Sequence, residues 1–170
     1  MTVSIIGDAF IDILVPTGGI NPGETHQRTI ICTCGGTANV AVELSKLDQK
    51  SAFIGKVGKD NFGMVFKNNL AQNIVSDQTF VDTKNPTGLC VSMIDASGDR
   101  TMVVNRGAND FFDANEMGSI LDRITSSEIA YFSGYSLQNQ TNYAIIEKIM
   151  QECANQQCIV YFNPGAPNII

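Results

Sequence analysis

Short apolar runs, glycine turns and helical patterns alternate along most of this sequence. Val3–Ile6 is an apolar run rich in β-branched residues that Gly7 closes, as in a strand buried on both faces. A helical pattern follows from Thr37, and a second short run, Ala52–Ile54, leads into another glycine turn and another helical pattern. This alternation favours an α/β fold with a mostly parallel sheet flanked by helices.

The first two predicted helices each carry an apolar side that we expect to pack on the sheet. Asp60 is placed to cap the amino end of the second helix. The apolar positions are Val40, Leu44 and Leu47 in the first helix, and Phe62, Val65, Phe66 and Leu70 in the second.

The middle of the chain interrupts the alternation. Residues 87–95 and 100–105 are predicted to form two strands of a β-hairpin, joined by a turn at 96–99. Residues 28–33 form another candidate strand, after an excursion rich in glycine and proline. We expect these segments to form a separate small sheet. The alternation returns with helices near 113–124 and 143–154, and with strands at 129–132 and 158–162.

Composition limits the classes of protein that this chain can belong to. Its 170 residues, 44% of them hydrophobic, suffice for one substantial core. A net charge of −6 argues against a nonspecific nucleic-acid scaffold, so no nucleic-acid partner is expected. The sequence has neither an apolar run of membrane-spanning length nor a signal-like leader, so we expect no membrane partner and a cytoplasmic location.

The cysteines raise the question of a metal site. Five scattered cysteines and a single histidine, His26, do not have the spacing of a structural zinc site or of a disulfide framework. In an extended strand Cys32 and Cys34 would lie on the same face, where small apolar residues pack well. We expect no metal site; bound zinc in the purified protein would contradict this.

Gly35 and Gly36 stand directly before a predicted helix. Adjacent glycines let backbone amides approach a ligand, and the start of the helix adds free N–H groups. Asn39 would lie in the first turn, where its amide can donate to and accept from a hydroxyl. An ordinary glycine turn before a solvated helix face explains the same spacing, so both interpretations stay open.

Asp12 lies shortly after the first predicted strand, and ligands of parallel sheets gather beyond the carboxyl ends of strands. A carboxylate there can accept hydrogen bonds from two neighbouring hydroxyls, although a solvated loop carboxylate is the more common case. The sequence contains neither a Walker A motif nor a Gly-x-Gly-x-x-Gly run.

Four stretches together carry a resemblance to a known family: "GGTANVAVELSKL", "FIGKVGKDNFG", "PTGLCVSMIDASGDRTMVVNRGAN" and "YFSGYSL". In this order they resemble the N-terminal half of a ribokinase-like carbohydrate kinase of the PfkB family. The resemblance implies a Rossmann-like core with a small β-sheet lid. Residues 1–170 would form a partial ribokinase-like domain, with lid segments at about 13–34 and 87–106 inserted in the core.

The same resemblance implies functions for individual residues. Asp12 matches the family's sugar-binding aspartate, and Gly35, Gly36 and Asn39 match its substrate-contacting Gly-Gly and Asn. Asn105 and Arg106 lie where the family returns from lid to core, and they are further candidates for substrate contact. The implied reaction is ATP-dependent phosphorylation of a sugar or nucleoside hydroxyl.

The sequence departs from the family pattern in one respect. No Gly-Ala-Gly-Asp motif, which carries the catalytic aspartate in this family, occurs in it. We therefore expect no catalytic residue here, an inactive chain when alone, and ATP and Mg²⁺ as cofactors of the complete kinase only. Homodimerisation through the lid or an exposed sheet edge is also expected. A non-catalytic sugar-binding or dimerisation module is the alternative.

Overall fold

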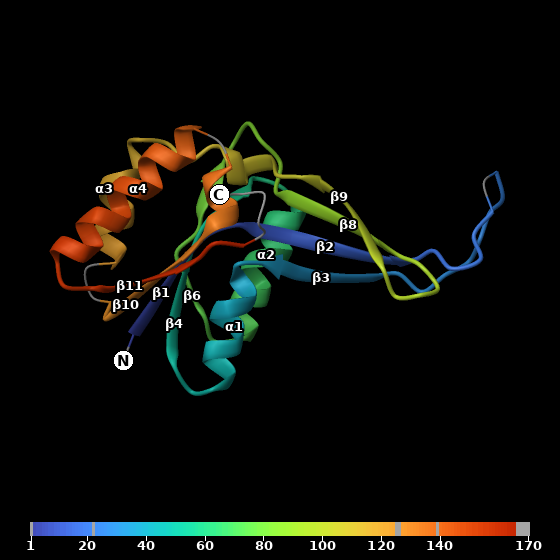
Figure 1. The fold of residues 1–170 in the computed structure, drawn as a ribbon, viewed down its shortest axis with the longest axis horizontal. Helices are drawn as coiled ribbons and strands as arrows, with labels where there is room; N and C mark the ends of the chain where they lie inside the picture. Colours follow the sequence, from blue (N-terminus) through green and yellow to red (C-terminus); the bar gives the residue numbers. More distant parts are fainter. Residues whose placement is uncertain (1, 22, 125–126, 139, 166–170) are drawn as a thin grey trace.

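The computed structural model describes residues 2–21, 23–124, 127–138 and 140–165. Within them the main sheet has the strand order β11-β10-β1-β4-β6, and every paired strand in it is parallel to its neighbour (Figure 1). Its strands are β1 (Thr2–Ile6), β4 (Lys50–Ile54), β6 (Ser76–Asp77), β10 (Ile129–Ser133) and β11 (Ile159–Asn163). The parallel order confirms the α/β fold class.

Helices cover both faces of the main sheet (Figure 1). They are α1 (Ala38–Lys46) and α2 (Asn61–Gln72) on one face, and α3 (Glu116–Ile124) and α4 (Gln140–Asn155) on the other. Consecutive residues of the central strand serve the two layers: Ile5 packs in the cluster of Phe66, and Ile6 in the cluster of Ile149. Because strand side chains alternate between faces, β1 is apolar toward both layers, and its buried Ser4 is hydrogen-bonded to Ser127.

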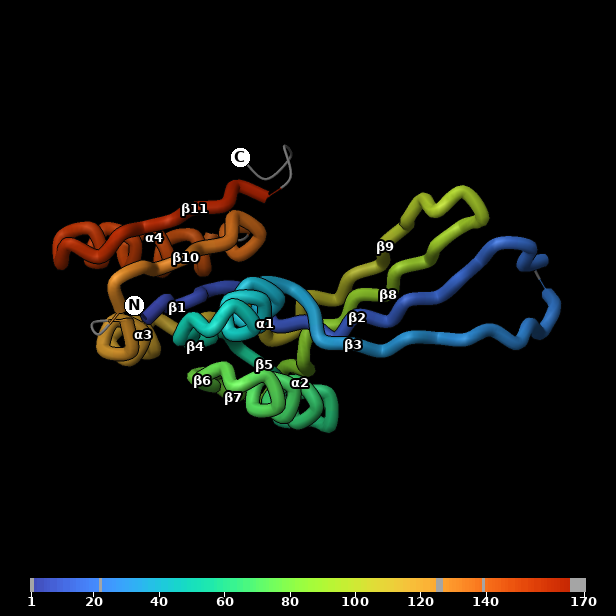
Figure 2. Tube along the Cα trace, turned by 90° about the horizontal axis from the view of Figure 1, so that it is seen from below, coloured from blue at the N-terminus to red at the C-terminus, as the bar shows by residue number. Residues whose placement is uncertain are grey.

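A second sheet projects away from this core, as Figure 2 shows. We call it the small sheet; its strand order is β3-β2-β8-β9 within the described residues. Its strands are β2 (Ala9–Pro16), β3 (Ile31–Gly36), β8 (Gly88–Ile94) and β9 (Arg100–Asn105). The antiparallel pairing of β8 with β9 confirms the predicted hairpin. β2 pairs in parallel with β8, so two strands that are separated in the sequence by much of the core lie side by side in the small sheet.

Shorter elements connect the two sheets. β5 (Lys56–Gly58) pairs in parallel with β7 (Phe80–Asp82). The single-turn helix η1 (Gly107–Asp110) follows β9 back into the core, and η2 (Gly134–Leu137) follows β10. η2 therefore lies at the carboxyl end of the main sheet, and Asn109 of η1 is hydrogen-bonded to Ala9, shortly after the end of β1.

Asp12 does follow the first strand, as predicted, but it lies within a second strand, β2, that the sequence reasoning did not predict. Only Gly7 and Asp8 separate β1 from β2, which begins at Ala9 and belongs to the small sheet. Likewise, β3 begins at Ile31 instead of residue 28.

Two helix faces also differ from the prediction. Helix α1 ends at Lys46, so Leu47 lies beyond it and is 69% exposed, while Ala38 and Ala41 are buried. In α2, Phe66 and Leu70 are buried as expected, but Phe62 and Val65 are exposed. Val40 and Leu44 do pack against the core as predicted, although they are only partly buried. Every described helix is too short or too polar to cross a bilayer.

Candidate functional site

Asp12 lies in the middle of β2, and its carboxylate lies against the neighbouring strand β3. Its side chain is half-buried, and burial raises the pKa of its carboxyl above the ordinary value for aspartate. Among the residues that the structure describes, none forms a hydrogen bond or ion pair with this carboxylate. Since a buried carboxylate without a partner is costly, the group is a strong candidate to receive hydrogen bonds from a ligand.

The two glycines of β3 each have a steric reason to be glycine. A Cβ atom at Gly35 would overlap the carboxylate of Asp12, so the carboxylate lies directly against the backbone of residue 35. Gly36 has a φ of +72°, and a Cβ atom there would lie 2.5 Å from the carbonyl oxygen of Asp8. The structure therefore brings Asp12 and Gly35 together, with Gly36 beside the end of β1.

Hydrogen bonds link the start of helix α1 to the residues that follow β1. The backbone N–H of Thr37 donates to the carbonyl oxygen of Asp8 at 2.9 Å, and the N–H of Asp8 donates to the Thr37 hydroxyl at 3.1 Å. Asn39 lies in the first turn of α1 and is exposed. In the described part of the chain no hydrogen bond links Asn39 to Asp12.

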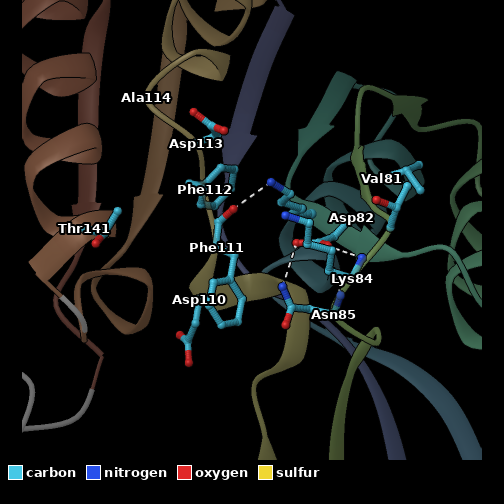
Figure 3. Close-up of a pocket in the computed structure, with 12 residues that line it drawn as sticks. Val81, Asp82, Lys84, Asn85, Asp110, Phe111, Phe112, Asp113, Ala114 and Thr141 are labelled. Atoms are coloured by element: carbon cyan, nitrogen blue, oxygen red, sulfur yellow. Dashed lines mark hydrogen bonds between the residues drawn. The ribbon is translucent and has the colours of Figure 1, made fainter.

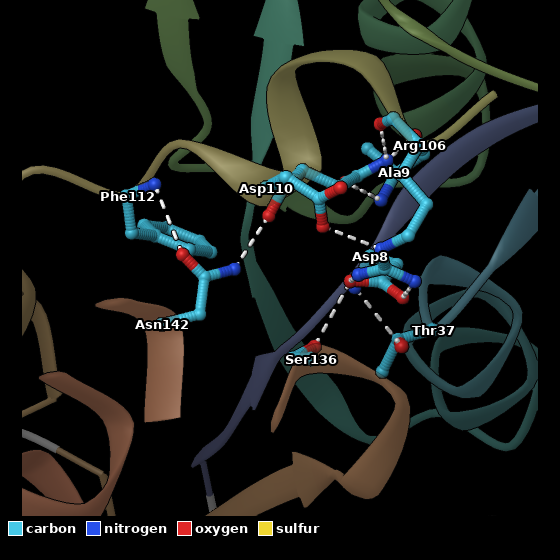
Figure 4. A network of polar contacts seen from close by, with 9 residues as sticks. Asp8, Ala9, Thr37, Arg106, Asp110, Phe112, Ser136 and Asn142 are labelled. Atoms are coloured by element: carbon cyan, nitrogen blue, oxygen red, sulfur yellow. Dashed lines mark hydrogen bonds and ion pairs between the residues drawn. The ribbon is translucent and has the colours of Figure 1, made fainter. Parts of the chain in front are cut away.

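Arg106 is held by two carboxylates (Figure 4). Its Nη1 and Nη2 atoms donate to the two oxygens of Asp8, both at 3.0 Å, and its Nε donates to Asp110 at 2.5 Å. Burial alone would lower the pKa of Arg106, but the charges of Asp8 and Asp110 raise it instead. Asn105, the neighbouring candidate, accepts a hydrogen bond from the backbone of Gly107.

Asp8 is a residue whose place in this network the sequence reasoning missed. Burial raises the pKa of its carboxyl, and Arg106 and Ser136 oppose that rise. The hydroxyl of Ser136 donates to Asp8 at 3.0 Å, so the Asp8 side chain links the segment after β1 to Arg106, which precedes η1, and to Ser136 in η2. The only local sequence signal for a functional role of Asp8 was its position two residues after a buried strand. Its pairing with Arg106 had no local signal, because the two residues are 98 positions apart.

A second buried network supports the first. Asn109 is fully buried; its side chain accepts from the N–H of Ala9 at 2.7 Å and donates to the carbonyl oxygen of Ala9 at 2.9 Å. Asn142 donates to the Asn109 carbonyl at 2.7 Å and accepts from the N–H of Phe112. These bonds hold η1 between β2 and α4, which positions Arg106 at the junction of the two sheets.

A cavity of about 710 Å³ lies elsewhere, between the 81–85 segment and the start of α4, with Phe111 and Phe112 between them (Figure 3). Two of its charged groups, Lys56 and Asp82, are already paired. Lys56 donates to the Phe111 carbonyl at 2.6 Å and to Glu116 at 2.9 Å. Asp82 accepts from the backbone N–H groups of residues 84 and 85. The cavity does not contain Asp12, and we place the candidate site at Asp12 because its carboxylate lacks such partners.

The cysteines and acidic residues form no metal centre in the described ranges, where no three His, Cys, Asp or Glu side chains are grouped suitably. Cys34 packs against the core and Cys32 is exposed. We expected both cysteines to pack in apolar surroundings. Only Cys34 does so.

The sequence matches the profile described as "pfkB family carbohydrate kinase" over residues 2–168. Among curated proteins, it is 34% identical to a fructokinase of Vibrio alginolyticus over 120 residues, covering 69% of this chain and 36% of that protein. It is 27% identical to a ribokinase of Haemophilus influenzae over 174 residues, covering 99% of this chain and 55% of that protein.

Solved structures show the same fold. The ribokinase of Giardia lamblia superposes with a TM-score of 0.86 at 19% identity, covering 98% of this chain and 55% of that one. A fructokinase of Xylella fastidiosa gives a TM-score of 0.85 at 22% identity, covering 99% and 53%. The chain thus spans between about a third and just over half of the lengths of these proteins.

Proposed function

The chain belongs to the pfkB family of carbohydrate kinases, and we propose that it supplies the acceptor-binding part of a kinase that phosphorylates a hydroxyl of a sugar or nucleoside. The observation that carries this proposal is the half-buried Asp12 carboxylate, which lies against the backbone of Gly35 without a partner in the described residues. Its relatives named as fructokinases and ribokinases support a sugar acceptor.

In this proposal Asp12 accepts hydrogen bonds from two adjacent hydroxyls of the acceptor. A carboxylate has two oxygens, so it fixes both the position and the rotation of a diol. The backbone at Gly35 and Gly36, and the side chain of Asn39, provide further donors on the same side. Binding here orients the reacting hydroxyl and lowers the entropic part of the barrier to transfer.

We further propose that the small sheet is a lid over the acceptor. Its segments would be those at about 13–34 and 87–106; strand β2 of this sheet carries Asp12, and β3 carries Gly35 and Gly36. A lid that excludes water would strengthen the hydrogen bonds of Asp12, since each is worth more where the effective dielectric constant is low.

Phosphoryl transfer also needs a base for the hydroxyl and stabilisation of charge on the transferred group. The sequence has no Gly-Ala-Gly-Asp motif, and no described group of carboxylates suits a metal ion. We therefore assign ATP and Mg²⁺ to the complete kinase, connect neither with a residue of this chain, and propose that the chain alone is inactive. ATP-dependent phosphorylation of a sugar by the purified chain would contradict this last proposal.

Isothermal titration calorimetry of the 170-residue chain with ribose, fructose and adenosine tests the acceptor site. We expect Asp12→Asn to weaken binding by about tenfold, the typical effect of losing hydrogen bonds to a charged group. Binding to the unmutated chain should weaken as the pH falls through the pKa of Asp12, which burial raises above the ordinary value for aspartate. Protonation removes the acceptor, so affinity is highest above that pKa.

The control is Asp48→Asn. Asp48 is exposed in the turn before β4, at the opposite end of the main sheet from the site, and its positive φ of 56° suits asparagine equally well. This variant should bind as tightly as the unmutated chain. Equal affinity of the Asp12→Asn variant and the unmutated chain would refute the proposed site.

A further inference from the structure

The candidate site carries an excess of negative charge. Asp12 is an unpaired carboxylate on β2, and the nearby ring of Phe10 lies 6.0 Å from Arg106, which contacts Asp8 and Asp110. With all of these groups ionised, three carboxylates and one guanidinium leave a formal charge of about −2. Asp8 and Arg106 are largely buried, with side chains 3% and 16% exposed, so solvent screens them weakly.

The positive charge of Arg106 is already compensated by carboxylates of the chain itself. Each of its three guanidinium nitrogens donates to a carboxylate, two to Asp8 and one to Asp110. The guanidinium also lies 6.0 Å from the centre of the Phe10 ring. Phe10 and Asp12 are two residues apart on β2 and therefore share a face of the small sheet. Arg106 is thus near the site without offering it a free cation.

No other described cation serves Asp12. Burial is the sole resolved influence on the pKa of this carboxyl, and within the described residues no lysine or arginine lowers it. Lys56, the buried lysine of the separate cavity, is paired with Glu116 and the Phe111 carbonyl. An acceptor with its own negative charge would therefore meet the uncompensated carboxylate of Asp12.

We propose that this site selects neutral sugars and discriminates against anionic ones, such as sugar phosphates and sugar acids, because the Asp12 carboxylate is unpaired and Arg106, on the Phe10 side of it, is already neutralised by Asp8 and Asp110. The proposal rests on the proposed function, of which it specifies the substrate class. Neutral hydroxyls need only the acceptor atoms of Asp12, whereas a phosphate or carboxylate adds repulsion that no described cation offsets.

Calorimetric titration of the 170-residue chain compares fructose with fructose 6-phosphate and with gluconate. At low salt we expect both anions to bind on the order of tenfold more weakly than fructose, as for unit charges about 10 Å apart near a protein surface. Raising the salt from about 0.02 M to about 0.5 M shortens the Debye length from roughly 20 Å to roughly 4 Å, which should narrow the gap. This comparison needs no variant and so does not depend on any variant's folding.

Asp110→Asn provides the complementary test, because it removes one of the two carboxylates that neutralise Arg106. We expect the ratio of fructose to fructose 6-phosphate affinity to fall by about fivefold at low salt. Asp48→Asn changes the net charge equally but far from the site, and it should leave the ratio unchanged. Circular dichroism confirms that each variant is folded.

The outcomes separate the two proposals. If fructose 6-phosphate or gluconate binds as tightly as fructose at low salt, the charge selectivity is wrong while the acceptor site stands. A ratio that falls equally in Asp110→Asn and Asp48→Asn would also overturn it, since the effect would then be one of net charge. If the chain binds no sugar, neutral or anionic, the proposed function fails and the selectivity fails with it.

Discussion

At the scale of single residues, Asp60 shows how one carboxylate can organise two elements. It caps α2 by accepting from the N–H of Gly63 at 2.8 Å, and it accepts from the N–H and the hydroxyl of Thr87, which precedes β8. Burial works to raise the pKa of Asp60, but these hydrogen bonds outweigh it and lower the pKa. The capping function was predictable from the sequence, whereas the bond to Thr87 was not, since 27 positions separate the two residues.

Asp60→Asn should lower the free energy of unfolding by about 1–2 kcal/mol at pH 7, because an amide accepts these hydrogen bonds less well than a carboxylate. A folded pKa below the unfolded value of about 3.9 means that the stabilisation is complete above that value and is lost as the pH falls through the folded pKa. Urea unfolding at pH 7 and at lower pH measures both effects. A constant difference between variant and unmutated chain at every pH would contradict this expectation.

At the scale of elements, the pairing of β2 with β3 determines the geometry of the candidate site. Phe10 is the register partner of Gly35, and Asp12 is the partner of Thr33. A shift of one residue would turn Asp12 to the other face of the small sheet and remove it from Gly35. The close contact between the Asp12 carboxylate and the backbone of residue 35 therefore depends on register as much as on residue type.

Gly35→Ala should abolish the affinity for sugar and destabilise the chain by about 1–3 kcal/mol, because the added methyl group competes with the Asp12 carboxylate for the same space. Gly118→Ala is the matched control: it adds the same group in α3, where nothing lies within 4 Å, and should stabilise the chain by about 0.5–1 kcal/mol. Thermal unfolding and sugar titration distinguish the two. Unchanged sugar affinity in Gly35→Ala would contradict the role given to this contact.

The sequence predicted elements well where the signal was local. The hairpin of β8 and β9, the Asp60 cap and the alternation of strands with helices all follow from patterns within about a dozen residues. Strand β2 was missed because its sequence continues from β1 with only Gly7 and Asp8 between. In the candidate site, the contact of Asp12 with Gly35 joins two residues that the sequence had proposed, but the pairing of Asp8 with Arg106 could not be predicted, since nothing local links residues so far apart.

At the scale of the whole molecule, two edges of the described structure expose apolar side chains. On β11, Ile159 is 63% and Tyr161 60% exposed, and on β9, Met102 and Val103 are both 59% exposed. Edge strands with unpaired backbone groups and apolar side chains favour pairing with another chain. These are the surfaces through which we propose that the chain forms homodimers.

Sedimentation velocity over a range of concentrations should show reversible association. Ile159→Lys places a charge on the β11 edge, and Met102→Lys places one on β9. We expect the variant on the edge that carries the contact to be monomeric, while the other associates like the unmutated chain. A monomer at every concentration for the unmutated chain would exclude both surfaces.

The burial of Asp8 has a consequence for the order of events during synthesis. The partners of its carboxylate, Arg106 and Ser136, lie 98 and 128 positions later in the chain. At about 5–20 residues per second, a ribosome needs roughly 6 to 26 seconds to add 128 residues. Strand β1, which lies between β4 and β10, is made first but is paired on both sides only after Ile129–Ser133 has been synthesised. During that interval the apolar strand at the centre of the sheet has to be shielded by other means, and a nascent chain stalled before β10 should be a preferred substrate for chaperones.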